Sequence, residues 1–131
     1  MSSFFLKNIE DPDGSLIPIE FKDLPFIPKR IFIVSNVPKN AERGQHAHFE
    51  TQQILICLKG KILVKLYNGK SLDEFHLNEK EGIFVDKMIW DSQVFLTGDD
   101  ILLSICSTNY DKKDYIENMK EFEEIINGIK K

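Results

Sequence analysis

The sequence predicts an all-β domain, a sandwich or barrel of short strands that ends in one α-helix. Turn signals are frequent, the apolar runs between them are short, and only the last segment has the three- and four-residue spacing of a helix. Short strands at this spacing are typical of sandwiches and barrels. The 131 residues fit one domain, residues 1–131, which can bury a core without disulfides or structural metals.

The strand signals strengthen along the chain. The sequence DPDG at 11–14 is a strong turn, and Asn68-Gly69 is a two-residue hairpin signal. In the N-terminal third we expect an edge strand at 16–21, a Pro-rich connector at 24–28, a buried strand at 30–34 and a polar loop at 38–44. Further strands are expected at 53–58, 61–67, 70–77, 82–85, 88–90, 94–96 and 100–107.

The C-terminal segment predicts a helix over residues 113–129 that packs on the barrel. Its apolar residues recur at intervals of three and four, and charged residues fill the positions between them. Asp111 or Asp114 can cap its start. The apolar stripe consists of Ile116, Met119, Phe122, Ile125, Ile126 and Ile129.

The composition argues against nucleic-acid and membrane partners. The net charge of -4 gives no basic face for nucleic acid and no attraction to an anionic membrane. The start of the chain lacks a signal-peptide pattern, and no stretch approaches the roughly 20 apolar residues that span a bilayer. Cys57 and Cys106 each lie in an apolar run and are expected to be buried free thiols. We therefore expect a cytoplasmic protein.

The residues with chemical potential lie close together in the middle of the sequence. His46 and His48 are two residues apart, a spacing that sends both imidazoles to one face of a strand. Arg43 precedes them, Gln53 opens the next strand, and Gly60 follows at a hairpin turn. Burying so much polarity in a barrel without a function is costly. Since an ordinary imidazole pKa near 6.5 suits proton transfer at neutral pH, we predict acid–base work.

We predict no bound metal. A firmly held divalent ion usually takes three or four ligands, often including a carboxylate. The two imidazoles and the Gln53 amide fall short of that set, although Asp91 can complete one. His76 lies in the outward phase of an alternating strand and is expected at the surface.

The spacing H-x-H, four residues, Gln, six residues, Gly resembles the first motif of the cupins, with Gln53 where metal-binding cupins carry Glu. Over nearly its whole length, the chain also resembles the nucleotide-sugar 3,4-ketoisomerases, which act on dTDP-4-keto-6-deoxyglucose. The most specific block is RGQHAH at 43–48 with Gln53. Weaker blocks follow in the right order at 11–16, 29–30, 58–60, 82–90 and 110–116.

This resemblance implies a cupin jelly-roll barrel that works without metal or cofactor, as a homodimer with exchanged N-terminal strands. It implies a dTDP-sugar substrate whose ketone moves from C4 to C3 through an enediol(ate). The expected enzyme is an isomerase that makes a dTDP-3-keto-6-deoxyhexose for deoxyaminosugar biosynthesis, and so for lipopolysaccharide or another surface glycan.

Such a reaction needs a base, a proton donor and a group that stabilises an oxyanion. We expect His48 to be the base and His46 its partner or a proton shuttle. Arg43 is expected to hold a sugar oxygen or the developing oxyanion through charge-assisted hydrogen bonds. The remaining expected catalytic residue is Asp91.

Four residues form the expected substrate-binding set. Gln53 would orient an imidazole or a sugar hydroxyl. Trp90, or a nearby aromatic residue, would stack on thymine. Arg30 and Gly44 belong to the blocks that carry the resemblance.

The chain departs from the pattern of this family at three places. Phe32 and Ile33 stand in the strand where the family commonly has Tyr, and Asp91 stands where a His commonly follows Trp. Both changes remove a proton carrier, and Asp91 can take over the role of the lost His if it faces the pocket. Asp13 also replaces a common Arg, which bears on phosphate or sugar contacts.

Three other functions fit the same residues. A sugar epimerase also removes a proton beside a ketone with a His base. A nucleotide-sugar-binding cupin without catalysis would fit the missing Tyr and His. A small metal-dependent oxygenase would bind its metal through His46 and His48.

Overall fold

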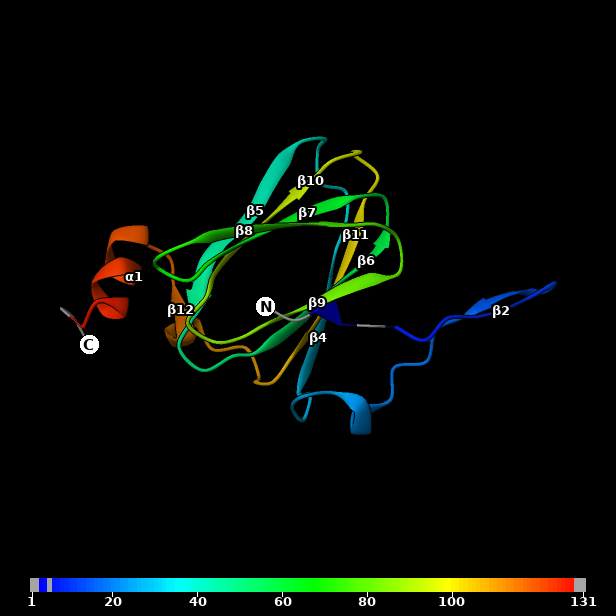
Figure 1. Ribbon diagram of the computed structural model, residues 1–131, viewed down its shortest axis with the longest axis horizontal. Coiled ribbons are helices and arrows are strands. Elements are labelled where there is room, and N and C mark those ends of the chain that lie inside the picture. The colour runs from blue at the N-terminus through cyan, green and yellow to red at the C-terminus, as the bar shows by residue number, and fades with distance from the viewer. Residues whose placement is uncertain (1–2, 5, 129–131) are drawn as a thin grey trace.

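Two five-stranded antiparallel sheets face each other in the computed structural model, which describes residues 3–4 and 6–128 (Figure 1). The first sheet has the order β1 (Ser3–Phe4), β9 (Glu81–Val85), β6 (Gln53–Lys59), β11 (Ile101–Cys106) and β4 (Arg30–Val34). The second has the order β12 (Tyr115–Ile116), β5 (Ala41–His48), β10 (Trp90–Phe95), β7 (Ile62–Tyr67) and β8 (Leu72–Leu77). No strand ladder joins these two sheets within the described ranges. The predicted all-β jelly roll with one short C-terminal helix is confirmed.

The main core lies between the two sheets. On β7, Ile62, Val64 and Leu66 alternate with more exposed residues, as expected for a strand with one buried face. The central strand β6 is buried on both faces, since Leu55 contributes to the core between the sheets and Ile54 to a second cluster. N-terminal residues cover that outer face, which explains the continuous apolar run of β6. This second cluster includes Leu6, Ile19, Leu24 and Phe26.

Three predictions for strands and loops are wrong. Residues 16–21 do not form an edge strand, because β3 ends at Leu16 and a 3-10 turn, η1 (Phe21–Asp23), follows. The predicted loop at 38–44 overlaps β5, which begins at Ala41. The pieces expected at 88–90 and 94–96 are replaced by one strand, β10, whose central residues are polar and buried.

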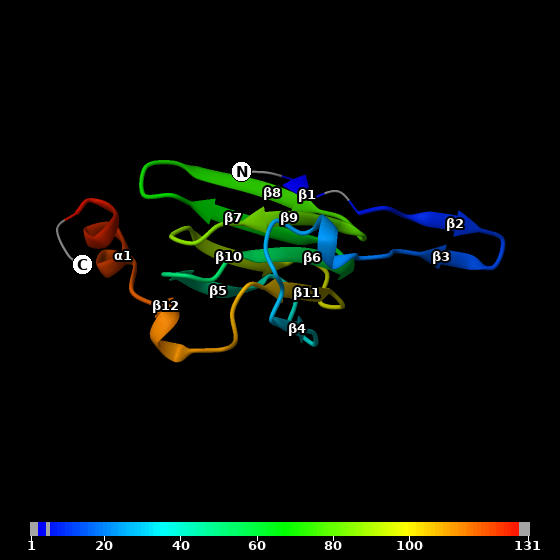
Figure 2. The same ribbon diagram turned by 90° about the horizontal axis from the view of Figure 1, so that it is seen from below.

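The predicted turn at 11–14 is confirmed. It joins β2 (Ile9–Asp11) to β3 (Gly14–Leu16) in a two-stranded hairpin. The hairpin extends away from the two sheets, at the opposite end of the molecule from the C-terminal helix (Figures 1 and 2). Cys57 and Cys106 are buried free thiols, as predicted.

The predicted helix over 113–129 begins too early. A 3-10 turn, η2 (Lys112–Asp114), and strand β12 come first, and α1 (Met119–Ile126) begins six residues later than expected. Asn118, rather than Asp111 or Asp114, caps α1 by accepting a hydrogen bond from the Glu121 N–H. Ile129 lies outside the described residues.

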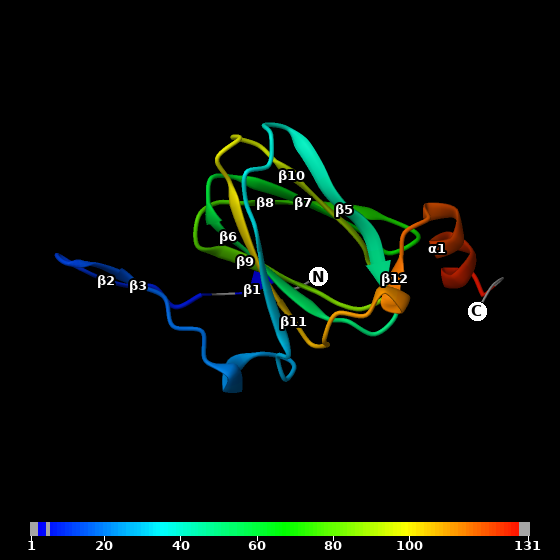
Figure 3. The ribbon, with the colours of Figure 1, turned by 180° about the vertical axis from the view of Figure 1, so that it is seen from behind.

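The apolar face of α1 packs outside the second sheet. Phe122 is fully buried there, with ring centroids 6.1 Å from Tyr67 and 5.8 Å from Trp90. Figure 3 shows β12 beside the end of β5, where the chain leads into α1. Within the described ranges, no helix has the length and apolar character needed to cross a membrane.

Candidate active site

A β-bulge in β5 places Arg43 on the same side of the strand as His46, and both residues line a cavity between the sheets. Asp91 of β10 pairs with His46, but Ser92 pairs with Gly44, so Gln45 is an extra residue in β5. Side chains alternate along a regular strand, so Arg43 would face away from His46 without the extra residue. The bulge therefore brings Arg43 into phase with both imidazoles.

Glycine is required at the bulge. Gly44 has φ +85, and a Cβ there would lie 3.0 Å from Gln93 Oε1 and 3.1 Å from the Asp91 carbonyl oxygen. A larger residue would be strained and crowded. The structure thus gives Gly44 a positioning role, whereas its predicted substrate contact stays a prediction.

Three rings meet at the end of β5. The ring centroids of His46 and His48 are 5.0 Å apart, so the prediction that both imidazoles share a face agrees with the structure. Tyr115 of β12 lies 4.4 Å from His48 and 5.0 Å from His46, measured between centroids. Tyr115 pairs with His48 in the β5–β12 ladder. The helix predicted over residues 113–129 hides this pairing, although Tyr115 lies in the block at 110–116.

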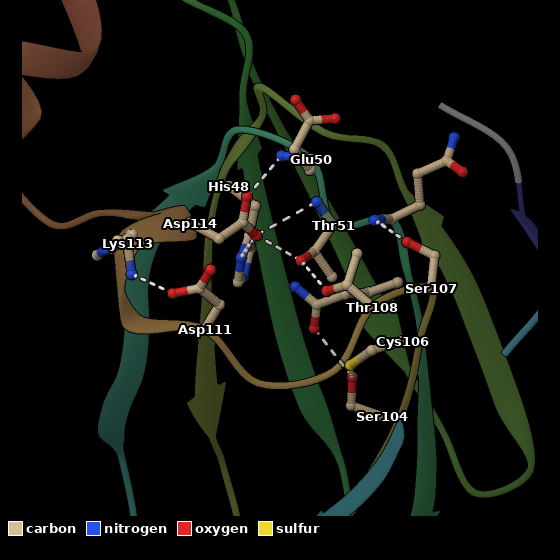
Figure 4. A network of polar contacts seen from close by, with 12 residues as sticks. His48, Glu50, Thr51, Ser104, Cys106, Ser107, Thr108, Asp111, Lys113 and Asp114 are labelled. Atoms are coloured by element: carbon tan, nitrogen blue, oxygen red, sulfur yellow. Dashed lines mark hydrogen bonds and ion pairs between the residues drawn. The ribbon is translucent and has the colours of Figure 1, made fainter. Parts of the chain in front are cut away.

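His48 is buried and has an acidic neighbour. Its Nδ1 lies 2.9 Å from Asp114 Oδ2, and Asp114 also accepts hydrogen bonds from residues 50 and 51 (Figure 4). The sequence offers Asp114 as a helix cap and as part of the block at 110–116, without a role in the site. The separation of 66 residues leaves no local signal for this contact.

A cavity of about 90 Å³ opens between the sheets beside His46. Gln53, Asp91, Gln93 and Arg43 supply its polar wall. Gln53 is buried, and its Oε1 accepts a 2.9 Å hydrogen bond from Ser104 Oγ. The apolar wall consists of Phe32, Val34, Leu55 and Leu102.

Asp91 is the unusual acid of this cavity. Its side chain is buried, its Oδ1 accepts a 2.6 Å hydrogen bond from Gln93 Nε2, and its Oδ2 has no hydrogen-bond partner. Burial raises the pKa of Asp91 to about 7, against a smaller lowering by the Gln93 hydrogen bond. Near neutral pH the Asp91 carboxyl can therefore hold or release a proton.

Both imidazoles are neutral at neutral pH. Burial, followed by the nearby His48, lowers the pKa of His46 to about 4. Burial also lowers the pKa of His48, and the hydrogen bond and charge of Asp114 oppose that effect. Neutral imidazoles are the form that can accept a proton.

Arg30 provides a cation beside the histidines. Its guanidinium lies 5.7 Å from the Phe32 ring centroid and 5.6 Å from the Tyr110 centroid. Burial alone would lower the pKa of Arg30, but hydrogen bonding to Tyr115 and the Cys106 thiol outweigh it and raise the pKa. Its Nε is buried without a hydrogen-bond partner, so this cation is partly unsatisfied.

The structure does not bring Trp90 together with the histidines. Trp90 lies on the opposite face of β10 from Asp91, against α1, where it lines a separate surface groove with Tyr67 and Met119. An aromatic ring closer to the site is Tyr110, whose centroid is 5.8 Å from that of Tyr115.

His76 is exposed on β8, as predicted. Among the described residues, no group of three or more His, Cys, Asp or Glu side chains is placed to hold a metal ion. That the protein works without a bound metal stays a prediction. Metal analysis of protein purified without chelator tests it.

Asp91→Asn should change the pH dependence of stability. The folded pKa of Asp91 is about 7 and its ordinary value is 3.8, so between these values the folded chain holds a proton that the unfolded chain releases. Stability contributed by the protonated carboxyl is complete below about pH 4 and is lost as pH rises toward 7. Asp91→Asn lacks this titrating group. The free energy of unfolding of the variant minus that of the parent should therefore be larger at pH 8 than at pH 4, by roughly 1.4 kcal/mol per unit of pKa difference, as measured by urea titrations at the two pH values. An equal difference at both pH values would contradict this.

The chain is similar to known enzymes over almost its whole length. The family described as FdtA: WxcM-like, C-terminal matches residues 2–127. The TDP-4-oxo-6-deoxy-alpha-D-glucose-3,4-oxoisomerase of Aneurinibacillus thermoaerophilus is 33% identical over 125 residues, covering 94% of this chain and 90% of that protein.

Solved structures of sugar 3,4-ketoisomerases are also similar to this chain. WlaRA, a TDP-fucose-3,4-ketoisomerase from Campylobacter jejuni, has a TM-score of 0.88 and 34% identity, covering 98% of this chain and 96% of that chain. QdtA, a sugar 3,4-ketoisomerase from Thermoanaerobacterium thermosaccharolyticum crystallised with TDP, has a TM-score of 0.92 and 32% identity, covering 97% and 94%. Fold and sequence together define a cupin-like protein of the sugar-isomerase class. More particularly, the chain belongs to the FdtA (WxcM-like, C-terminal) family of nucleotide-sugar 3,4-ketoisomerases.

Proposed function

We propose that this chain converts TDP-4-keto-6-deoxyglucose to a TDP-3-keto-6-deoxyhexose, in a pathway to a deoxyaminosugar. The observation that carries the proposal is the pair of adjacent neutral imidazoles, His46 lining the cavity and His48 buried beside it, in a chain whose relatives are TDP-sugar 3,4-ketoisomerases. No metal or cofactor takes part in the proposed reaction. The C4 ketone itself acidifies the C3 proton that must be removed.

The first step breaks the C3–H bond. His48 takes the proton, the electron pair forms a C3–C4 double bond, and the C4 oxygen gains a proton or a hydrogen bond. In the second step C4 receives a proton, while the C3 hydroxyl loses its proton and becomes the ketone. Atoms and electrons balance without an external oxidant or reductant.

His46 and Asp91 are the proposed carriers of the returning proton. They lie opposite each other in the β5–β10 ladder, and both line the cavity. Asp91, with a pKa of about 7 and a free Oδ2, has the proton affinity that such a role needs. This supports the proposal that Asp91 replaces the His of related sequences.

The cations and the buried amide are proposed to bind the sugar nucleotide. Arg30 has an unpaired Nε beside the histidines, and Arg43 lines the cavity; both can hold a sugar oxygen or the oxyanion. Gln53 would orient a hydroxyl. We propose Tyr110 rather than Trp90 as the ring that stacks on thymine, because Tyr110 is exposed beside Arg30.

We also propose a homodimer built from the N-terminal half. Ile31 and Ile33 are 53% and 61% exposed on β4, which pairs only with β11 among the described strands, and Ile27 is 80% exposed. Ile9 and Leu16 lie exposed on the projecting hairpin, which supports strand exchange. Such apolar surface is typical of an interface. Sedimentation equilibrium should give twice the chain mass; a monomer at micromolar concentration would refute the dimer.

Incubation with TDP-4-keto-6-deoxyglucose in D2O tests the function, with an aminotransferase added in a parallel sample to trap the labile ketone. Ketone migration gives a 3-keto product by NMR. Epimerisation would instead leave the ketone at C4, with exchange at C3 and C5. Tight TDP-sugar binding without turnover or exchange would favour a non-catalytic binding protein.

A further inference from the structure

We propose that Asp114 is a positioning residue: it holds His48 in the tautomer with the proton on Nδ1, so that Nε2 is the basic nitrogen. The inference rests on the proposed function for its kinetic consequences, but the tautomer itself can be measured without any substrate.

The polypeptide backbone fixes Asp114 beside His48. Asp114 ends η2, and its carbonyl oxygen accepts a 2.9 Å hydrogen bond from the Phe49 N–H. The next residue, Tyr115, pairs with His48 in the β5–β12 ladder. Both sides of the contact are therefore held by main-chain hydrogen bonds, which is the rigidity that a positioned catalytic group needs.

The Asp114 carboxylate is surrounded by donors. Oδ1 accepts from the Glu50 N–H at 2.7 Å, and Oδ2 accepts from the Thr51 N–H at 3.3 Å and from Thr51 Oγ1 (Figure 4). Thr51 is buried, and its hydroxyl lies 2.6 Å from that of Thr108. Since Thr51 donates to Asp114, Thr108 donates to Thr51.

This donor set keeps Asp114 ionised. Burial would raise the pKa of Asp114, but the hydrogen bonds from Thr51, Glu50 and His48 outweigh burial and lower it. An ionised carboxylate only accepts hydrogen bonds, so the proton in the 2.9 Å contact must sit on His48 Nδ1. No other hydrogen bond joins the His48 ring to a described residue, which leaves the Nε2 lone pair for the substrate.

The same carboxylate favours the imidazolium that forms when His48 takes a proton. The hydrogen bond and charge of Asp114 both raise the pKa of His48, against the lowering by burial. Asp114 thus acts on tautomer and on basicity together. A purely structural role, in which Asp114 only ties the turn at residues 49–51, would change neither.

Nitrogen-15 NMR of the ligand-free, full-length protein tests the tautomer directly. The chain has three histidines, so single His→Asn variants assign the signals. For His48 we expect the chemical shift of a protonated nitrogen at Nδ1 and of an unprotonated nitrogen at Nε2. The opposite pattern would overturn the inference even if the enzyme is an active ketoisomerase. The expected pattern in a chain without ketoisomerase activity would refute the proposed function alone.

Asp114→Asn tests the consequence. Its amide can donate to Nδ1 and so select the wrong tautomer, and kcat should fall by about 10²- to 10⁴-fold with KM changed by less than about threefold. The acidic limb of kcat/KM should move to lower pH by roughly one unit, because burial then acts on His48 unopposed. The double variant His48→Asn/Asp114→Asn should be no slower than His48→Asn.

Asp111→Asn is the matched control. Asp111 lies in the same turn and accepts a hydrogen bond from the Lys113 N–H, but no contact joins it to His48. An asparagine can keep that hydrogen bond, so kcat and the acidic limb should stay as in the parent. An unmoved limb in a folded Asp114→Asn variant, or equal losses in both variants, would contradict the inference. If Asp114→Asn does not fold, the NMR measurement on the parent decides.

Discussion

The variant His48→Asn should lose at least about 10²- to 10⁴-fold of its turnover, to the point of no detectable product, while its two sheets stay folded. Loss of the base stops removal of the C3 proton. The asparagine side chain can still hydrogen-bond to Asp114, which limits the structural cost at this buried position. Circular dichroism and a thermal melt, beside a coupled assay of the 3-keto product, provide the measurement.

Two controls separate the roles of the histidines. His46→Asn should lose less turnover, because water can replace a proton shuttle but not a positioned base. His76→Asn, on the exposed edge strand β8, should behave as the parent. Near-parental activity of His48→Asn would exclude His48 as the base, and equal, complete losses in His46→Asn and His48→Asn would leave the division of roles unsupported.

A second large effect is expected at Gly60, the motif glycine after the histidines. Gly60 has φ +84, and an added Cβ would lie 2.1 Å from Asp100 Oδ1 and 3.0 Å from its Cα. Asp100 cannot move freely, because Oδ1 accepts from the Lys61 N–H at 2.8 Å and Oδ2 from the Gly98 N–H at 3.0 Å. Gly60→Ala should therefore lower the free energy of unfolding by about 3 kcal/mol or more, measured by urea titration.

Gly128→Ala isolates the clash from the backbone strain. Gly128 also has positive φ, +75, but a Cβ there would meet nothing within 4 Å. We expect this variant to lose only about 1 kcal/mol, the usual cost of a left-handed conformation for alanine. Equal losses in the two variants would show that the Asp100 contact adds nothing. In this account Gly60 is required at its place in the motif for packing rather than for chemistry.

Local patterns predicted the strands well where one face is buried. The structure confirms the alternation predicted on β7, because the period of side-chain burial follows directly from strand geometry. It also confirms a hairpin at Asn68-Gly69, but four residues, 68–71, join β7 to β8 where a two-residue turn was predicted. The same logic placed His46 and His48 on one face. Strand prediction failed in the N-terminal segment because its apolar residues pack in a second cluster or lie exposed, and so do not alternate toward the main core.

The C-terminal error has a specific cause. Ile116 lies in β12, but its spacing from Met119 continues the phase of the helix, so periodicity alone extended the helix backwards. That error hid Asp114 and Tyr115, the neighbours that complete the surroundings of His48. Contacts across more than sixty residues of sequence depend on tertiary folding and leave no pattern in a single chain.

The alternation of apolar and polar residues along the strand also does not predict the bulge at residues 44–45. A regular strand would direct Arg43 to the opposite face from His46, and only the register of Asp91 and Ser92 reveals the extra residue. Likewise, the raised pKa of Asp91 goes with a buried side chain and an oxygen without a hydrogen-bond partner, and the residue type alone predicts neither.

Transfer of hydrogen between neighbouring sugar carbons can be followed most directly with TDP-4-keto-6-deoxyglucose carrying deuterium at C3. After incubation with the parent chain, NMR should show a ketone at C3, with the deuterium gone from that carbon and found at C4 or in water. A recovered sugar with its ketone still at C4 and its deuterium still at C3 would contradict the account.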